Sequence, residues 1–212
     1  MKVLVACEES QRVCTAFRER GHEAYSCDVQ ECSGGHPEWH IMQDVLPLIN
    51  GHCEFFTLDG TSHQIDGKWD LLIAHPPCTY LSNVGARHLY KGGMLNSERY
   101  AKGLEAKTFF MKFYLADCEH ICVENPVPSK VYQLPNYTQI VQPYMFGHPY
   151  KKSTCLWLKN LSCLKATDMV STKFVQSTKI AGNWFNKGGK DRQKNRAKTF
   201  PGIAKAMAEQ WG

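Results

Sequence analysis

The sequence predicts an α/β fold in which helices flank a mainly parallel β-sheet. Two observations support this prediction. Short apolar runs recur along the chain, each ended by polar or turn-forming residues, as expected of buried strands. Segments with apolar residues at three- and four-residue spacing lie between these runs and predict helices. Strands that alternate with helices are typical of a parallel sheet with helical crossovers.

The chain begins with a predicted strand–helix–strand unit. Residues 2–7 (KVLVAC) form an apolar run, and Ser10 is placed to cap a helix over residues 11–20. Gly21 is expected to end this helix, because glycine accepts the left-handed conformation found at helix ends. A second strand is expected over residues 22–27.

Two further strand signals follow. Residues 54–66 contain two alternating runs around Asp59-Gly60, a turn sequence that predicts a small β-hairpin. Residues 71–74 form a buried strand that stops before Pro76 and Pro77, because proline cannot donate to a sheet. Cys78 is therefore expected just beyond the carboxyl end of a strand.

The second half of the chain continues the alternation. A strand over residues 120–124 is expected to stop at Asn125-Pro126. The other predicted elements are a long helix over 97–116, strands over 139–142 and 153–158, and a terminal helix over 202–210.

Size and composition favour a single domain over residues 1–212. The chain has 212 residues and 43% hydrophobic content, enough for an ordinary core. The absence of a long apolar run and of a cleavable leader predicts a cytoplasmic protein that does not bind membranes. The ten cysteines are interpreted as reduced thiols, because disulfide scaffolds are usually much shorter.

Basic residues gather near the end of the chain, where they could attract phosphates. A solvated loop is the alternative interpretation. The cluster comprises Lys187, Lys190, Arg192, Lys194, Arg196 and Lys198.

Four chemically active side chains follow predicted strands or end them. They are Asp28, Asp44, Cys78 and Glu124. Because ligands bind outside the carboxyl ends of the strands in an open α/β sheet, these side chains are expected along one edge. Each also has an ordinary structural explanation: helix caps for the aspartates, a core thiol for the cysteine, and a salt bridge for the glutamate.

Cys78 is the candidate nucleophile. The two prolines before it fix the backbone direction where the chain leaves the sheet, which favours an aimed thiol. A cysteine attacks as its thiolate and needs nearby positive charge to lower its pKa. His75, Lys151 and Lys152 are candidates for this role.

Two motifs resemble those of the SAM-dependent cytosine 5-methyltransferases. HPPCTYLS at 75–82 resembles their proline–cysteine loop, and ENP at 124–126 resembles their Glu-Asn-Val motif. The resemblance implies a Rossmann-like methyltransferase domain. It also implies that Cys78 adds to carbon 6 of cytosine, that Glu124 binds ring nitrogen 3 and the amino group, and that carbon 5 then takes the methyl group. Asn125 and Lys152 complete the implied catalytic set.

The resemblance also implies a site for S-adenosylmethionine (SAM). VLVACEES matches the position of the family's first motif, Asp28 matches the acid that holds the ribose, and Asp44 matches the acid that binds the adenine amino group. This first motif has no glycine, so Ser10 and Gln11 are expected to supply contacts. The implied cofactor residues are Ala6, Cys7, Glu8, Ser10, Asp28, Val29, Asp44, Val45 and Pro76.

The implied partner is DNA containing cytosine. Residues 159–192 are short where larger family members carry a target-recognition domain, so sequence selectivity is expected to be slight, to come from loops, or to be supplied by a protein partner. The ending RAKTFPGIAKAMAEQW resembles the terminal helix of phage and prophage-type members. The expected nucleic-acid contacts are Ser82, Asn83, Lys187, Lys190, Arg192 and Arg196.

Several other functions are compatible with parts of the sequence. Cys27, Cys32, His36 and His40 superficially resemble zinc ligands, but their spacing does not match a finger, and no metal is expected. Methyltransferases of exocyclic amines have Asp or Asn before two prolines, where this chain has His75. A cysteine hydrolase and a non-catalytic or degenerate nucleic-acid-binding methylase fold are the remaining alternatives.

Overall fold

A mainly parallel sheet organises the protein and confirms the predicted α/β class. The computed structural model describes residues 1–177 and 192–212, and within them the sheet has seven strands in the order β10-β12-β9-β6-β1-β2-β3. The strands from β9 to β3 are mutually parallel, and β12 is antiparallel to both β9 and β10. These strands are β1 (Lys2–Ala6), β2 (Glu23–Asp28), β3 (His40–Met42), β6 (Leu71–Ala74), β9 (His120–Pro126), β10 (Gln139–Val141) and β12 (Thr154–Lys159).

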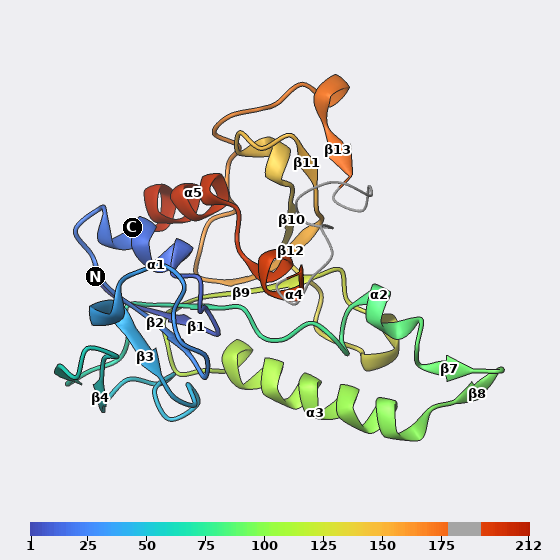
Figure 1. Cartoon of the computed structure of the whole chain (residues 1–212), viewed down its shortest axis with the longest axis horizontal. Helices are drawn as coiled ribbons and strands as arrows, with labels where there is room; N and C mark the ends of the chain where they lie inside the picture. The colour runs from blue at the N-terminus through green and yellow to red at the C-terminus, as the bar shows by residue number, and fades with distance from the viewer. Residues whose placement is uncertain (178–191) are drawn as a thin grey trace.

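Helices cover both faces of this sheet (Figure 1). Successive side chains of a strand point to opposite faces, so Val5 packs with Phe17 and Met207 while Leu4 packs with Phe110. The first face is covered by α1 and α5, and the second by α3. The helices are α1 (Arg12–Arg18), α2 (Asn83–Ala86), α3 (Ser97–Tyr114), α4 (Arg192–Ala197) and α5 (Pro201–Trp211).

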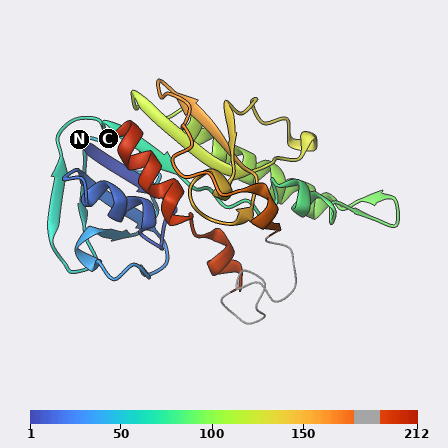
Figure 2. The same ribbon diagram turned by 90° about the horizontal axis from the view of Figure 1, so that it is seen from above.

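The two ends of the chain meet beside the sheet. Figure 2 shows α5 alongside α1, with both termini nearby. Arg12 reinforces this contact by donating from Nη1 to the carbonyl of Thr199 at 2.9 Å. The terminal segment therefore belongs to the same core as the first strand. No helix in the described ranges combines the length and apolar character needed to cross a bilayer.

Three small two-stranded sheets surround the main one. The hairpin predicted around Asp59-Gly60 is confirmed, whereas the other two small sheets were not predicted from sequence. One of these is a hairpin that projects from the molecule ahead of α3 (Figure 1). The three pairs are β4 (Cys53–Phe56) with β5 (Ser62–Ile65), β7 (Tyr90–Lys91) with β8 (Met94–Leu95), and β11 (Tyr150–Lys151) with β13 (Gln176–Ser177).

Two local predictions are wrong. Ser10 does not cap α1: the carboxylate of Glu8 accepts hydrogen bonds from the amides of Val13 (2.7 Å) and Cys14 (3.1 Å) instead. A carboxylate meets the exposed amides of a helix start better than a hydroxyl because it also offsets their partial charge. β9 does not stop before Asn125 but runs through Pro126, because β12 pairs with it to its end.

Candidate active site

The carboxyl edge of the parallel strands carries the candidate site. β2 ends at Asp28, and Asp44 follows β3 by two residues. Cys78 follows β6, and Glu124 lies near the end of β9, the strand hydrogen-bonded to β6. Because parallel strands end at the same edge, the fold brings all four residues to one side of the sheet.

The loop that carries Cys78 is tied to the segment after β9. Asn125 is 1% exposed, and its Nδ2 donates to the carbonyl of Pro76 at 2.8 Å. The amide of Ser82 donates to the carbonyl of Cys78 at 3.0 Å, which closes the loop into a turn. These bonds fix the thiol relative to Glu124. Asn125 therefore helps to position the Cys78 loop. Its membership of the implied catalytic set stays a prediction.

Glu124 is ion-paired with His75. The register of β6 and β9 places Ala74 opposite Val123, so the next residues, His75 and Glu124, lie side by side. His75 Nδ1 lies 3.1 Å from Glu124 Oε2, with the two side chains 9% and 14% exposed. Burial opposes ionisation of Glu124, but the hydrogen bond and charge of His75, with the charge of Lys152, hold the pKa of Glu124 below its usual value.

Glu8, a second buried acidic residue, also affects the pKa of His75. It lies in the first turn, residues 7–11, which connects β1 to α1. Burial disfavours the charged imidazole, but the hydrogen bond and charge of Glu124, with the charge of Glu8, raise the pKa of His75 above its usual value. Nε2 of His75 is buried without a hydrogen-bond partner in the described residues. Glu124 therefore favours the protonated form of His75, which gives the site a proton carrier beside Glu124.

The surroundings of Cys78 favour the protonated thiol. Burial and the charge of Glu124 raise its pKa, while the charges of Lys152 and Arg196 oppose that rise. His75, a candidate for lowering the pKa of Cys78, is paired with Glu124 instead of the thiol. The expected contribution of Lys152 is confirmed in direction, although burial and Glu124 outweigh it.

Lys152 and Arg196 approach the site from the late part of the chain. Lys152 precedes β12, and its Nζ donates to the carbonyl of Arg196 in α4 at 2.9 Å. Burial lowers the pKa of Lys152, although the charges of Glu124 and Cys78 counteract it. Arg196, a member of the terminal basic cluster, therefore lies on the same side as Cys78 and Glu124. Lys151 is exposed on β11.

Asp28 and Asp44 lie together on the other half of the edge, near Cys7. Burial and then the charge of Asp28 raise the pKa of Cys7, with a smaller contribution from Asp44. Oδ1 of Asp28 accepts from the Gln30 amide at 3.0 Å, and Oδ1 of Asp44 accepts from the Leu46 amide at 3.1 Å. Within the described residues, neither Oδ2 has a hydrogen bond, so both remain available as acceptors.

The first turn reaches a glycine-like conformation without glycine. Cys7 and Gln11 have φ values of 59° and 57°, in the left-handed region. The side chain of Gln11 is fully buried and hydrogen-bonds the carbonyl (2.7 Å) and the amide (3.1 Å) of His36. Gln11 therefore holds the 29–36 loop against the turn, a role different from the expected cofactor contact. The carboxylate of Glu8 is similarly occupied by its helix-capping bonds.

The remaining predicted site residues differ widely in exposure. Ala6, Ser10, Val45 and Pro76 are buried, whereas Val29 is 73% exposed. Ser82 is also buried, and its Oγ accepts from the Gly85 amide at 3.2 Å, which caps α2.

Several predicted DNA contacts remain without structural detail. Asn83 is exposed at the start of α2. Lys187 and Lys190 lie outside the described residues, and Arg192 begins α4 without a described side chain. No group of three or more potential metal ligands occurs in the two described ranges.

Comparison with known proteins gives structural likeness at low identity. No family model and no curated sequence matches the chain. Similar solved structures include a DNA modification methyltransferase candidate encoded within an E. coli prophage (12% identity, TM-score 0.44, 80% of this chain) and the Entamoeba histolytica methyltransferase EhMeth (14%, 0.46, 80%). The S. pombe Dnmt2 methyltransferase is a third (13%, 0.40, 86%). This chain spans 52–57% of the length of those three proteins. At these scores, the likeness by itself assigns no activity.

Proposed function

We propose that this protein is a SAM-dependent DNA methyltransferase that modifies carbon 5 of cytosine through a covalent Cys78 adduct. One observation carries the proposal: the thiol of Cys78 follows β6, and the buried carboxylate of Glu124 on the adjacent parallel strand β9 is close enough for its charge to raise the pKa of that thiol. The histidine and lysine beside this pair fit a site that moves protons on a bound base.

The first chemical step is addition of the thiolate to carbon 6 of cytosine. The thiol first loses its proton, and the sulfur–carbon bond then forms as the ring π electrons shift toward nitrogen 3. Glu124 accepts a hydrogen bond from the amino group, and the proton held by its pair with His75 can reach nitrogen 3 through the carboxyl. Neutralising that nitrogen stabilises the adduct and leaves carbon 5 rich in electrons.

Methylation then takes place at carbon 5. Bound SAM supplies the methyl group as an electrophile. The carbon-5 proton is lost to solvent, the nitrogen-3 proton returns to the pair of Glu124 and His75, and expulsion of the Cys78 thiolate restores the ring double bond. One methyl group is thus exchanged for one released proton, and the enzyme groups return to their starting state. Lys152 stabilises the departing thiolate because its charge favours the ionised form of Cys78.

The residues near the first turn fit the cofactor. Asp28 and Asp44 each keep a carboxylate oxygen available, as hydroxyl and amino donors on a ligand require. Cys7 lies beside both acids, and its left-handed backbone replaces the glycine usual in such a turn. We therefore assign SAM binding to Asp28, Asp44 and this turn.

Direct transfer of a labelled methyl group tests the proposal. The protein is incubated with labelled SAM and duplex or single-stranded DNA, and the products are resolved by base-level mass spectrometry. Label at carbon 5 of cytosine is the expected result. Label on an exocyclic amine would replace this proposal with an amino-methyltransferase, and retention of DNA without label would favour a non-catalytic binding protein.

Asp28→Ala should weaken SAM binding without removing the nucleophile. Loss of the carboxylate removes its hydrogen bonds to the cofactor, and we expect affinity to fall about tenfold to a hundredfold, since charge-assisted hydrogen bonds contribute about 1.5–3 kcal/mol. Titration calorimetry measures this change. Asp66→Ala, which removes an exposed carboxylate in β5's following turn, serves as the control. Equal SAM affinity in both variants would move the cofactor site elsewhere.

A further inference from the structure

An arm follows the Cys78 loop and projects away from the sheet. We define the arm as residues 83–96, which contain α2 and the β7–β8 hairpin. Figures 1 and 2 both show this hairpin extending beyond the rest of the molecule. Gly92 and Gly93 form its turn with φ values of 58° and 81°. The arm thus begins next to the nucleophile and returns at the start of α3.

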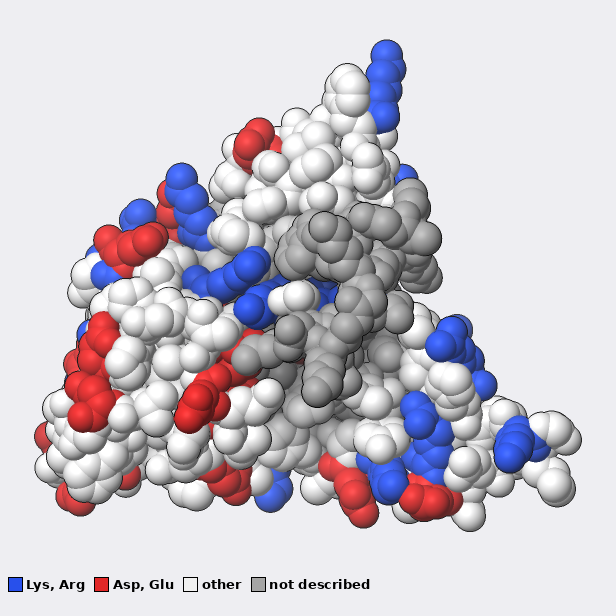
Figure 3. Space-filling view, viewed as in Figure 1, with Lys and Arg blue, Asp and Glu red and all other residues white. Residues whose placement is uncertain are grey.

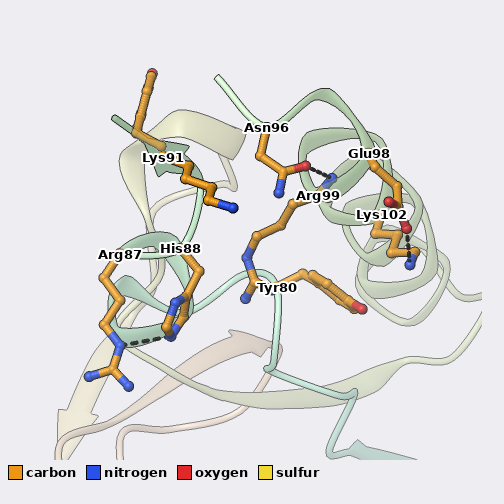
Figure 4. A pocket seen from close by; sticks show the side chains of 9 residues that line it. Tyr80, Arg87, His88, Lys91, Asn96, Glu98, Arg99 and Lys102 are labelled. Atoms are coloured by element: carbon orange, nitrogen blue, oxygen red, sulfur yellow. Dashed lines mark hydrogen bonds and ion pairs between the residues drawn. The ribbon is translucent and has the colours of Figure 1, made fainter. Parts of the chain in front are cut away.

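An open pocket of about 650 Å³ lies between the arm and the first turns of α3 (Figure 4). Its chemistry is mainly cationic and aromatic, and Figure 3 shows Lys and Arg recurring over this projecting part of the surface. The residues of this kind that line it are Arg87, Lys91, Arg99, Lys102, Tyr80 and Tyr90.

The positive charge in the pocket is largely uncompensated. Glu98 is the one carboxylate among its described lining residues, and it is paired with Lys102 at 2.6 Å. Within residues 1–177 and 192–212, neither Arg87 nor Lys91 has a carboxylate partner. Figure 4 shows Lys91 reaching across the opening toward Arg99. A cationic pocket without its own counter-charge is suited to an anionic ligand.

Arg99 connects this pocket to the nucleophile loop. Its Nη2 donates to the carbonyl of Gly85 at 3.1 Å, and its guanidinium lies 5.0 Å from the centre of the Tyr80 ring. Tyr80 is only two residues from Cys78. The Cys78 loop therefore forms one wall of the pocket through Tyr80, and a ligand long enough to reach both could contact the pocket and the thiol together.

The arm also exposes apolar surface near its tip. Tyr90, Met94 and Leu95 are 56%, 76% and 48% exposed. Such side chains suit bases or sugars in a groove, while neighbouring cations suit phosphates. A small anion would explain the charge but not the exposed apolar residues. An acidic protein would explain both, but not why the arm begins at the loop of the proposed nucleophile.

We propose that the pocket binds a backbone phosphate of the DNA strand that contains the target cytosine, with the arm tip lying in the adjacent groove. The inference rests on the proposed function for its choice of DNA as ligand. It assigns to Arg87, Lys91 and Arg99 a DNA-holding role in a chain whose residues 159–192 are short where larger members of the resembled family carry a target-recognition domain. The binding free energy contributed by phosphate contacts is independent of base sequence.

Binding of a labelled cytosine-containing duplex, measured by fluorescence anisotropy over a salt series, tests the site. Arg87→Glu combined with Lys91→Glu should weaken binding by about tenfold or more and reduce the slope of log Kd against log salt by about two. Lys112→Glu combined with Lys165→Glu makes the same change in total charge on exposed residues elsewhere and is the control. The control should lose no more than about threefold.

Two further measurements distinguish a wrong pocket from a misfolded variant and from a wrong proposed reaction. Lys91→Ala, a milder change on an exposed strand, should reduce the slope of log Kd against log salt by about one. This variant still tests the pocket if the double variant does not fold. Equal loss in the pocket and control variants, or an unchanged slope for Lys91→Ala, overturns the pocket. A pocket-specific loss in a protein that transfers no methyl group supports the pocket and overturns the proposed reaction instead.

Discussion

Cys78→Ala is expected to abolish methyl transfer while leaving SAM affinity unchanged. Without the thiol, carbon 5 of cytosine never gains the electron density that it needs to attack a methyl group. We expect the rate to fall by on the order of 10⁴-fold or more, as is typical when a covalent nucleophile is removed. Single-turnover transfer from labelled SAM measures the rate, and calorimetry measures cofactor binding.

The environment of Cys78 adds a pH dependence to this prediction. Burial and Glu124 raise the pKa of the thiol, so the reactive thiolate is scarce at neutral pH and becomes more abundant as pH rises. Wild-type transfer should therefore increase with pH on the acidic side of its profile. Lys152→Ala should shift that rise to higher pH, because removing the lysine removes a charge that favours the thiolate.

A substrate with fluorine at carbon 5 offers a direct test of the adduct. The carbon-5 proton is absent, so elimination stops after methyl transfer and the protein remains attached to DNA. Wild-type protein and Cys163→Ser, which changes an exposed cysteine, should both form this adduct, whereas Cys78→Ala should not. An adduct in the Cys78→Ala variant would require a different nucleophile.

The order of elements could be predicted because it depends on local patterns. Residues 71–74 have an apolar run closed by two prolines, and the structure reproduces that strand without change. The β3 strand was missed because His40–Met42 is short and follows a glycine-containing loop. Its pairing with β2, which no local pattern encodes, makes it a strand.

The sequence predicted the site residues that belong to single motifs, but not the contacts between motifs. Cys78 and Glu124 could be selected because each follows or ends a recognisable strand. The pairing of His75 with Glu124 requires β6 and β9 to be neighbours, which depends on strand order in the folded sheet. A histidine directly after a buried strand was the available signal, and it was interpreted as a partner of the thiol.

The basic pocket illustrates the same limit more strongly. Arg87 and Arg99 are separated in sequence by a short hairpin that carries few β-forming residues. Their meeting depends on the turn at Gly92-Gly93 and on the bond from Arg99 to Gly85. The terminal basic cluster could be recognised because its residues are close in sequence. The residues of the basic pocket are brought together only by folding.

His75→Gln is expected to lower the transfer rate by roughly 10²–10³-fold at pH 8, the effect of losing a general acid. Glutamine can still donate a hydrogen bond to Glu124, but it cannot carry a proton that titrates. In the wild-type protein, the pKa of His75 is raised and that of Glu124 is lowered, so the proton of the pair rests on the imidazole. The matched control is His120→Gln, which changes a histidine at the start of β9, the strand that carries Glu124.

The pH profile distinguishes proton transfer from packing in this variant. With His75 present, the proton remains available up to a pKa above the ordinary imidazole value of about 6.5. With glutamine, the proton must reside on Glu124, which loses it at lower pH. Ionisation of the Cys78 thiol affects both proteins, so the variant rate is divided by the wild-type rate at each pH. This ratio should rise as pH falls, whereas a purely structural defect would lower the rate by the same factor at every pH.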